Sequence, residues 1–206
     1  MMLFYSPSQE LKMLKTSFKG LLLSASILTL LGCTATPSYT NITPQLQLES
    51  NRQAFTNQQP WKIDSQDLRI ARYVIEISSG DGVATLINEQ QSLRLLVEKS
   101  LTQAWTDNNL KLDNNSDYQV DIKLVKALAK VSESTLSYDA SSQMIVDVAL
   151  SHQGKHFHKI FRSTKQWDGA FANQVNNITE QLNKQLSLLL KQIVEDQELN
   201  SQLQQF

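Results

Sequence analysis

The stretch Tyr118-Gln119-Val120-Asp121-Ile122-Lys123-Leu124 alternates polar and apolar side chains. Because side chains along a strand point alternately to its two faces, this pattern predicts a strand with one buried and one solvated face. Beyond Val125 the apolar positions change phase, which indicates either a β-bulge or a strand buried on both faces. Residues 144–150 and 156–167 predict two further strands, with Gln153-Gly154 as the tight turn between them.

The last part of the chain changes its hydrophobic period. Between Phe171 and Val194 apolar residues recur at three- and four-residue steps, which predicts a long amphipathic helix. The acidic residues that follow oppose the negative end of the helix dipole, so we expect residues 196–206 to be a disordered tail. Just before the helix, Asp168 and Gly169 predict an N-cap and a sharp junction.

The first half predicts one more helix and several shorter strands. Residues 89–108 have an apolar face at helical spacing that includes Trp105, which we expect in the core. Residues 69–78 and 83–87 predict two strands, joined by a turn at Ser79-Gly80-Asp81-Gly82. Further short alternating stretches predict strand segments at residues 44–49 and 61–64.

Taken together, these elements predict the α+β class. We expect a mainly antiparallel sheet of about five or six strands, with two helices packed on one face. The expected bounds of this single domain are residues 42–195.

The N-terminal part has the pattern of a lipoprotein signal. An apolar run after Lys19 ends in Leu30-Leu31-Gly32-Cys33, which has the form of a bacterial lipobox. The run is shorter than the roughly 20 apolar residues of a membrane-spanning helix. We therefore expect residues 1–32 to be removed by cleavage between Gly32 and Cys33, with lipid added to Cys33. The alternative is an ordinary cleaved signal, cut near Ala35.

Three neighbouring features refine this prediction. Met13 makes a more conventional signal start than Met1, because the first 12 residues add the acidic Glu10. Residues 33–41 are rich in Thr, Ser and Pro and predict a flexible tether. Thr34 follows the lipobox where Asp would favour the inner membrane, so by resemblance to enterobacterial lipoproteins we expect the outer membrane.

Composition narrows the possible partners. Cys33 is the only cysteine, and acylation would account for an odd thiol in an exported protein. The formal net charge is −1, and no basic run is present. A chain of this kind releases few counterions from a phosphate backbone, so we expect no nucleic-acid partner.

Candidate chemical groups are scattered along the chain. His152, His156 and His158 flank the predicted hairpin turn, with the last two on one face, but no Cys or carboxylate ligand stands close by in sequence. We expect them to be solvated strand residues and predict no metal site. Four aspartates without distinctive spacing could pair in space for general acid–base chemistry. They are Asp121, Asp139, Asp147 and Asp168.

Several short motifs, in their order and spacing, resemble the YajG family of uncharacterised outer-membrane lipoproteins. They are Ser92-Leu93-Arg94-Leu95-Leu96, residues 118–124, residues 138–150 and Asp168-Gly169-Ala170-Phe171. The resemblance runs from Cys33 almost to the C-terminus, and departs in the N-terminal extension and in the polar segment before Trp61. It implies a lipid-anchored protein on the periplasmic face of a Gram-negative outer membrane, and it brings no established catalytic residue or cofactor.

The leading hypothesis is a non-enzymatic interaction or envelope-accessory module, tethered through Cys33 near a protein partner in the cell envelope. No catalytic, cofactor or metal site is predicted, and the sequence sets no oligomeric state. The alternative is a carrier of a small lipid or cell-wall-derived ligand, which would use an apolar pocket between sheet and helices. An enzyme would require carboxylates or histidines that converge in one cleft.

Overall fold

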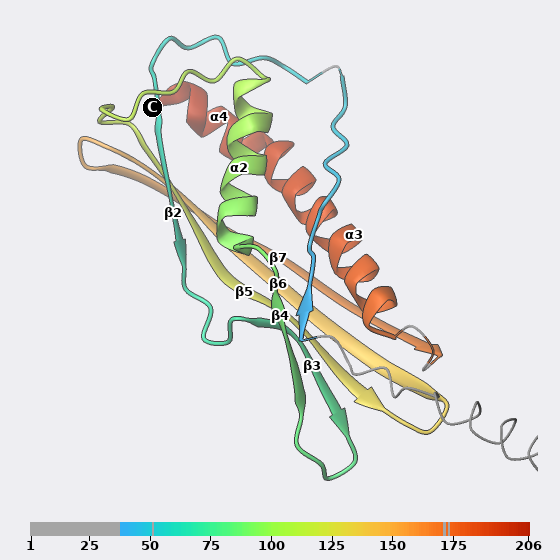
Figure 1. Cartoon of the computed structure of the whole chain (residues 1–206). Coiled ribbons are helices and arrows are strands. Elements are labelled where there is room, and N and C mark those ends of the chain that lie inside the picture. The colour runs from blue at the N-terminus through green and yellow to red at the C-terminus, as the bar shows by residue number, and fades with distance from the viewer. Residues whose placement is uncertain (1–37, 51, 171, 173) are drawn as a thin grey trace, which may run out of the picture. The chain divides into compact units, whose positions relative to one another are not determined.

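A computed structural model describes residues 38–50, 52–170, 172 and 174–206. The expected signal peptide, its cleavage site at Gly32 and Cys33, and the first part of the tether lie outside these residues. The described chain forms a seven-stranded sheet and the helices α2, α3 and α4 (Figure 1), which confirms the α+β class. The strands are β1 (Tyr39–Thr40), β2 (Lys62–Asp67), β3 (Tyr73–Ser79), β4 (Thr85–Glu89), β5 (Gln119–Glu133), β6 (Ser137–His152) and β7 (Lys155–Ala170). The helices are α2 (Leu93–Thr106), α3 (Gln174–Val194) and α4 (Gln197–Gln205).

The sheet mixes antiparallel and parallel pairs. Its order is β1-β4-β3-β5-β6-β7, and β2 also pairs with β5, along the half that β3 leaves free. The predicted hairpins β3–β4 and β6–β7 are antiparallel, and so is the pair β5–β6, whereas β1–β4, β2–β5 and β3–β5 are parallel. The sequence gives no local signal for the parallel pairs, because long connections bring those strands together.

A bulge in β5 explains the change of phase seen in the sequence. The register against β6 shifts between Leu124 and Lys126, so the bulge alternative is correct. The shift keeps the apolar side chains on one side of the sheet along the whole strand. The buried set is Val120, Ile122 and Leu124 before the bulge, and Ala127, Ala129 and Val131 after it.

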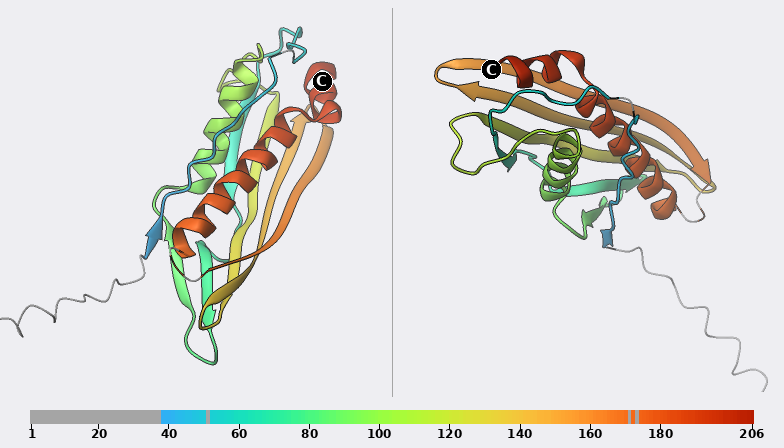
Figure 2. Two further views of the ribbon diagram at one scale, coloured as in Figure 1. Left: turned by 90° about the vertical axis from the view of Figure 1, so that its right-hand side faces the viewer. Right: turned by 90° about the horizontal axis from the view of Figure 1, so that it is seen from above.

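Among the described residues, helices cover one face of the sheet. Helices α2 and α3 lie over the same face of the strands (Figure 2). Alternate residues of β6 from Tyr138 to Leu150 are buried against them, and the residues between point to the other side. The apolar stripe predicted for the last helix packs into this interface, and Trp105 is buried there as expected. The opposite side of the sheet is the uncovered face.

A buried amide fixes α3 on the sheet. The side chain of Gln185 is 2% exposed and accepts a hydrogen bond from the Ser142 hydroxyl on β6. Its Nε2 donates to the carbonyl oxygen of Ser163 on β7 at 3.0 Å. Because a buried polar group needs partners, this triad sets the position of the helix along both strands.

Residues 44–49, predicted as an edge strand, are not a strand in the structure. The segment runs extended along α3 instead, and its backbone N–H groups bond to helix side chains. Thr43 N donates to Asn183 Oδ1 at 2.8 Å, and Gln45 N donates to Ser187 Oγ at 2.9 Å. Polar and apolar residues do alternate along this segment, as in an extended chain. Its neighbour, however, is the surface of α3, where polar side chains four residues apart bond to the segment, rather than another strand.

Other expected boundaries also need correction. The tail predicted to be disordered, residues 196–206, forms α4, because Leu199 and Leu203 are buried and Asp196 caps the helix by accepting from Leu199 N at 2.9 Å. The end of the expected tether is also ordered, since β1 pairs with β4.

The predicted junction at Asp168 and Gly169 lies inside β7 rather than at the start of the helix. Gly169 faces Tyr138 across the strand pair, and a methyl group there would lie 2.6 Å from the Tyr138 hydroxyl oxygen. The missing side chain of Gly169 therefore leaves the space that the Tyr138 ring occupies.

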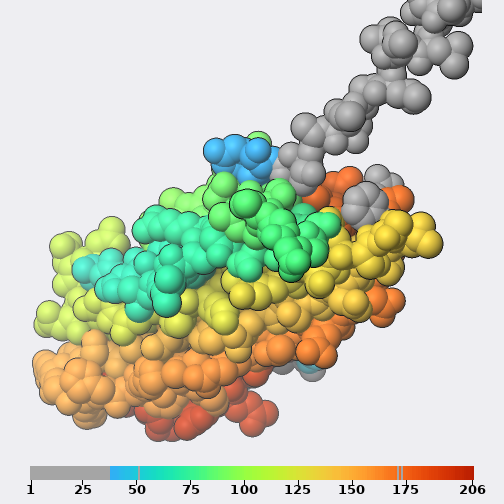
Figure 3. All heavy atoms as spheres, turned by 90° about the horizontal axis from the view of Figure 1, so that it is seen from below, coloured from blue at the N-terminus to red at the C-terminus, as the bar shows by residue number. Residues whose placement is uncertain are grey.

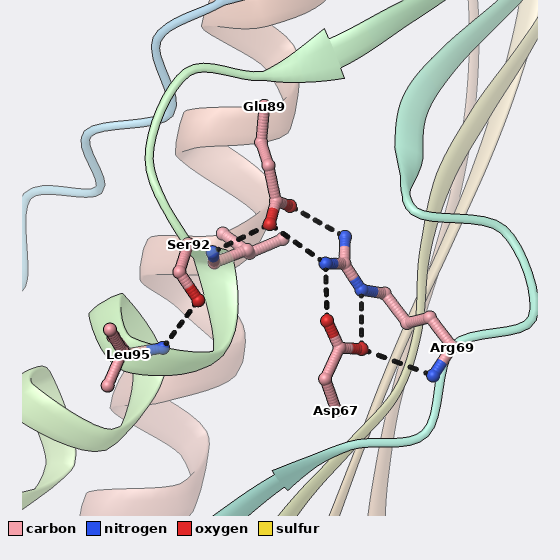
Figure 4. Close-up of polar contacts among 6 residues, drawn as sticks. Asp67, Arg69, Glu89, Ser92 and Leu95 are labelled. Carbon is pink, nitrogen blue, oxygen red and sulfur yellow. Dashed lines mark hydrogen bonds and ion pairs between the residues drawn. The ribbon is translucent and has the colours of Figure 1, made fainter.

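One buried cation joins three elements (Figure 4). Arg69, in the loop after β2, has a side chain that is 1% exposed and bonds to Asp67 through Nε and Nη2 at 2.9 and 2.8 Å. Nη1 and Nη2 also bond to Glu89 at 2.7 and 3.0 Å. Glu89 Oε1 in turn accepts from Leu93 N at 3.1 Å, while Ser92 Oγ accepts from Leu95 N at 3.4 Å. The cluster thus ties the end of β2 to the end of β4 and the start of α2.

The ionisation of this cluster follows from its contacts. Burial opposes the charge on Arg69, but hydrogen bonds to both carboxylates hold its pKa above the ordinary value. The same hydrogen bonds from Arg69 lower the pKa of Asp67. A lowered pKa in the folded state adds stability above the unfolded value of about 4, and this stability is lost as the pH falls through the folded pKa.

We predict that Arg69→Met destabilises the domain by about 3–5 kcal/mol at neutral pH, because it leaves two carboxylates partly buried without their cation. Urea denaturation measures the free energy of unfolding. The difference from the native chain should narrow as the pH falls below about 4, because the native chain then loses the stability that comes from the lowered pKa of Asp67. Arg162→Met, at an exposed position of β7, is the matched control. Equal costs for the two variants would contradict the role of Arg69.

Candidate functional site

The register of four strands builds two polar rows across the uncovered face. Each row crosses β3, β5, β6 and β7 at directly paired positions. The first row is Glu76, Lys130, Ser141 and Gln166, and the second is Ser78, Ser132, Asp139 and Asp168. These eight residues line an open hollow of about 670 Å³, which we call the acidic hollow.

The charges of the acidic hollow do not balance. It contains the carboxylates of Glu76, Asp139 and Asp168 but only one ammonium group, that of Lys130. Lys130 Nζ lies 3.6 Å from Glu76 Oε1, and the Tyr73 hydroxyl donates to Glu76 Oε2 at 3.0 Å. That hydrogen bond raises the pKa of the Tyr73 phenol. Glu76 is therefore partnered within the fold, and the excess charge belongs to the two aspartates.

Asp139 and Asp168 face each other across the antiparallel pair β6–β7. Neither forms an ion pair within the described part of the chain. Like charges at directly opposed positions destabilise a sheet, so this pair reduces stability unless a cation comes from outside. The arrangement suits a positively charged group of a partner.

The pairing of Asp139 with Asp168 could be derived from the sequence through the predicted hairpin turn, although the spacing of the aspartates did not indicate it. A two-residue turn at Gln153-Gly154 pairs His152 with Lys155, and counting back along the hairpin places Asp139 opposite Asp168. The turn was predicted, with both central residues at positive φ in the structure, so the pairing followed from it. Glu76 and Ser78 of β3 had no such signal, because β3 pairs with β5 in a parallel register. Lys130 and Ser132 of β5 pair with β6 in an antiparallel register, but the turn between these two strands was not predicted.

The other candidate residues lie elsewhere. Asp121 accepts a hydrogen bond from Gln119 at 2.8 Å, and Asp147 lies 2.9 Å from His158 Nε2 on the uncovered face. His152 stacks on Tyr118 on the covered side, with ring centroids 3.6 Å apart. The three histidines therefore do not converge. Among the described residues, no three His, Cys, Asp or Glu side chains gather as ligands of a metal ion.

The space between sheet and helices is filled by side chains. Trp61, Trp105 and Val146 are each fully buried there. The acidic hollow lies outside this interface, and so does a hollow of about 830 Å³ between Arg52 and α4. In the part of the chain that the structure describes, none of the helices combines the length and apolarity needed to cross a bilayer.

Comparisons with known proteins identify a family and a shared fold. Residues 44–204 match a family model described as "Uncharacterized lipoprotein". A crystal structure of a Xanthomonas campestris protein is similar at a TM-score of 0.57 and 13% identity, over 80% of this chain and 96% of that one. A minor lipoprotein from Acinetobacter baumannii aligns at a TM-score of 0.32 and 12% identity, over 67% of this chain and 90% of that one. A comparison with curated protein sequences gives no match.

We predict that Asp139→Asn raises the free energy of unfolding by about 0.2–1 kcal/mol, since it removes a repulsion between directly opposed charges. Chemical denaturation at neutral pH and low salt measures the change, and added salt should reduce it. Asp81→Asn, at an exposed turn position, is the control. A clear loss of stability in Asp139→Asn would mean that the carboxylate supports the fold rather than a binding surface.

Proposed function

Since the chain belongs to the family of uncharacterised lipoproteins, we propose that it is a lipid-anchored binding module without enzymatic activity, on the periplasmic face of the outer membrane. The family match confirms the resemblance to YajG-type lipoproteins seen in the sequence. Beyond family membership, the chain would then carry a lipid on Cys33, lie at the outer membrane, and bind a protein partner in the envelope through one surface.

The anchor rests on the sequence Leu30-Leu31-Gly32-Cys33. Each buried CH₂ of an acyl chain contributes about 0.8 kcal/mol, so one chain holds a protein only marginally and several hold it permanently. We expect three such chains on Cys33. The anchor then holds the domain at the membrane, and the folded part is free to bind.

The acidic hollow is the observation that supports binding. It lies on the face that none of the described helices covers, and it contains an opposed carboxylate pair that the described residues do not neutralise. A basic segment of an envelope protein would supply the missing charge and remove the repulsion. The carrier alternative has less support, because the described side chains fill the interface where a ligand would lie.

In-cell photo-crosslinking tests this proposal. A photoreactive amino acid at Ser141, in the acidic hollow, should give a reproducible protein adduct, whereas the same group at Gln192, an exposed position of α3, should not. The double variant Asp139→Asn, Asp168→Asn should lose the Ser141 adduct at unchanged protein abundance. Asp81→Asn should keep it. Equal adducts from both positions, or an adduct that survives the double variant, would contradict a binding role for the hollow.

A further inference from the structure

Two turns leave the sheet at the same end. The β3–β4 turn comprises residues 80–84, and the β5–β6 turn comprises residues 134–136. Ser79 pairs with Glu133, so the strands that lead into the turns finish side by side. Figure 3 looks onto this end, with the green β3–β4 hairpin towards the viewer and the yellow β5–β6 turn also in view. We call it the turn end.

Each turn exposes an aliphatic side chain. Val83 is 99% exposed and Leu136 is 82% exposed, whereas Ile87 of β4 and Tyr138 of β6 close by in sequence are buried. A single exposed aliphatic residue is ordinary on a protein surface. The second observation is the direction in which the chain enters β1. That direction places the expected lipid anchor on the side of the domain where both side chains lie.

The chain comes into β1 from the turn end. β1 runs parallel to β4, with Tyr39 beside Asn88 and Thr40 beside Glu89. The carbonyl oxygen of Ser38 accepts a hydrogen bond from Asn88 N at 2.9 Å. Since β4 itself starts at Thr85, directly after the β3–β4 turn, a strand parallel to it also starts from that side.

The length of the tether limits how far the domain can stand from its anchor. Five peptide steps join Cys33 to Ser38, and at 3.3–3.6 Å for each residue they reach at most about 18 Å. Ser38 lies beside the step from Ile87 to Asn88, and Val83 lies four residues before Ile87, about 13 Å along the strand direction. A fully extended tether therefore reaches only a few ångström beyond the turn end.

We infer that the turn end rests on the phospholipid surface, with Val83 and Leu136 among the headgroups. This inference depends on the lipidation of Cys33 in the proposed function, because the lipid fixes that residue at the bilayer. Asp81 and Glu133 lie at the same end, so the contact is apolar and gains nothing from anionic headgroups. The occupant of this surface is the lipid, which the short tether holds against it.

Single-cysteine labelling tests the contact in the full lipidated chain. Because acylation blocks the thiol of Cys33, Val83→Cys or Leu136→Cys offers one reactive thiol for a fluorophore such as NBD, which brightens and shifts to shorter wavelength outside water. The matched control is Asn114→Cys, at an exposed position in the loop before β5, at the far end of the strand. The vesicles contain phosphatidylethanolamine and phosphatidylglycerol.

The lipidated, labelled protein in vesicles is compared with the same labelled variant that also carries Cys33→Ala, kept in detergent-free buffer. We expect the vesicle sample to show a several-fold rise and a blue shift in emission at positions 83 and 136, but not at 114. A higher share of phosphatidylglycerol should not increase the effect. If the lipidated protein floats with vesicles and all three probes remain in water, the membrane contact is wrong while the anchor stands. If the native chain does not float, the proposed anchor itself fails.

Discussion

The ion pairs of Arg69 hold together the part of the fold on which the rest depends. Its guanidinium bonds to Asp67 at the end of β2 and to Glu89 at the end of β4, and Glu89 also accepts from the first turn of α2. Thr40 of β1 pairs with Glu89 in the sheet. β1, the first covering helix and the end of β2 therefore meet at one buried cluster, where an unpaired charge would be costly.

The two sides of the sheet differ in character. The covered side is a packed core in which Gln185 fixes the position of α3. The uncovered side is polar, and its acidic hollow lies within a few residues of the turns that end β3 and β5. If the turn end faces the bilayer, the hollow lies near the lipid surface, and the partner presents its basic segment close to the membrane.

Periodicity predicted most of the fold because most elements obey a local pattern. β5 with its bulge, the β6–β7 hairpin, α2 and α3 all have one buried face, which a repeat of two or of three to four residues reveals. The parallel partners of β5, the extended segment along α3 and the cluster around Arg69 depend on residues distant in sequence. α4 was missed because its two buried leucines lie among Gln, Asn and Ser. For the site, Asp139 and Asp168 were predictable from the hairpin turn, whereas Glu76 and Lys130 were not.

Everything proposed for this domain depends on a lipid attached to Cys33. Intact-mass analysis of the native chain, extracted from membranes with detergent, tests it most directly. We expect one species that starts at Cys33 and carries the added mass of a diacylglyceryl group and an N-linked acyl chain. A chain with an unmodified Cys33, or one that begins after it, would contradict the account.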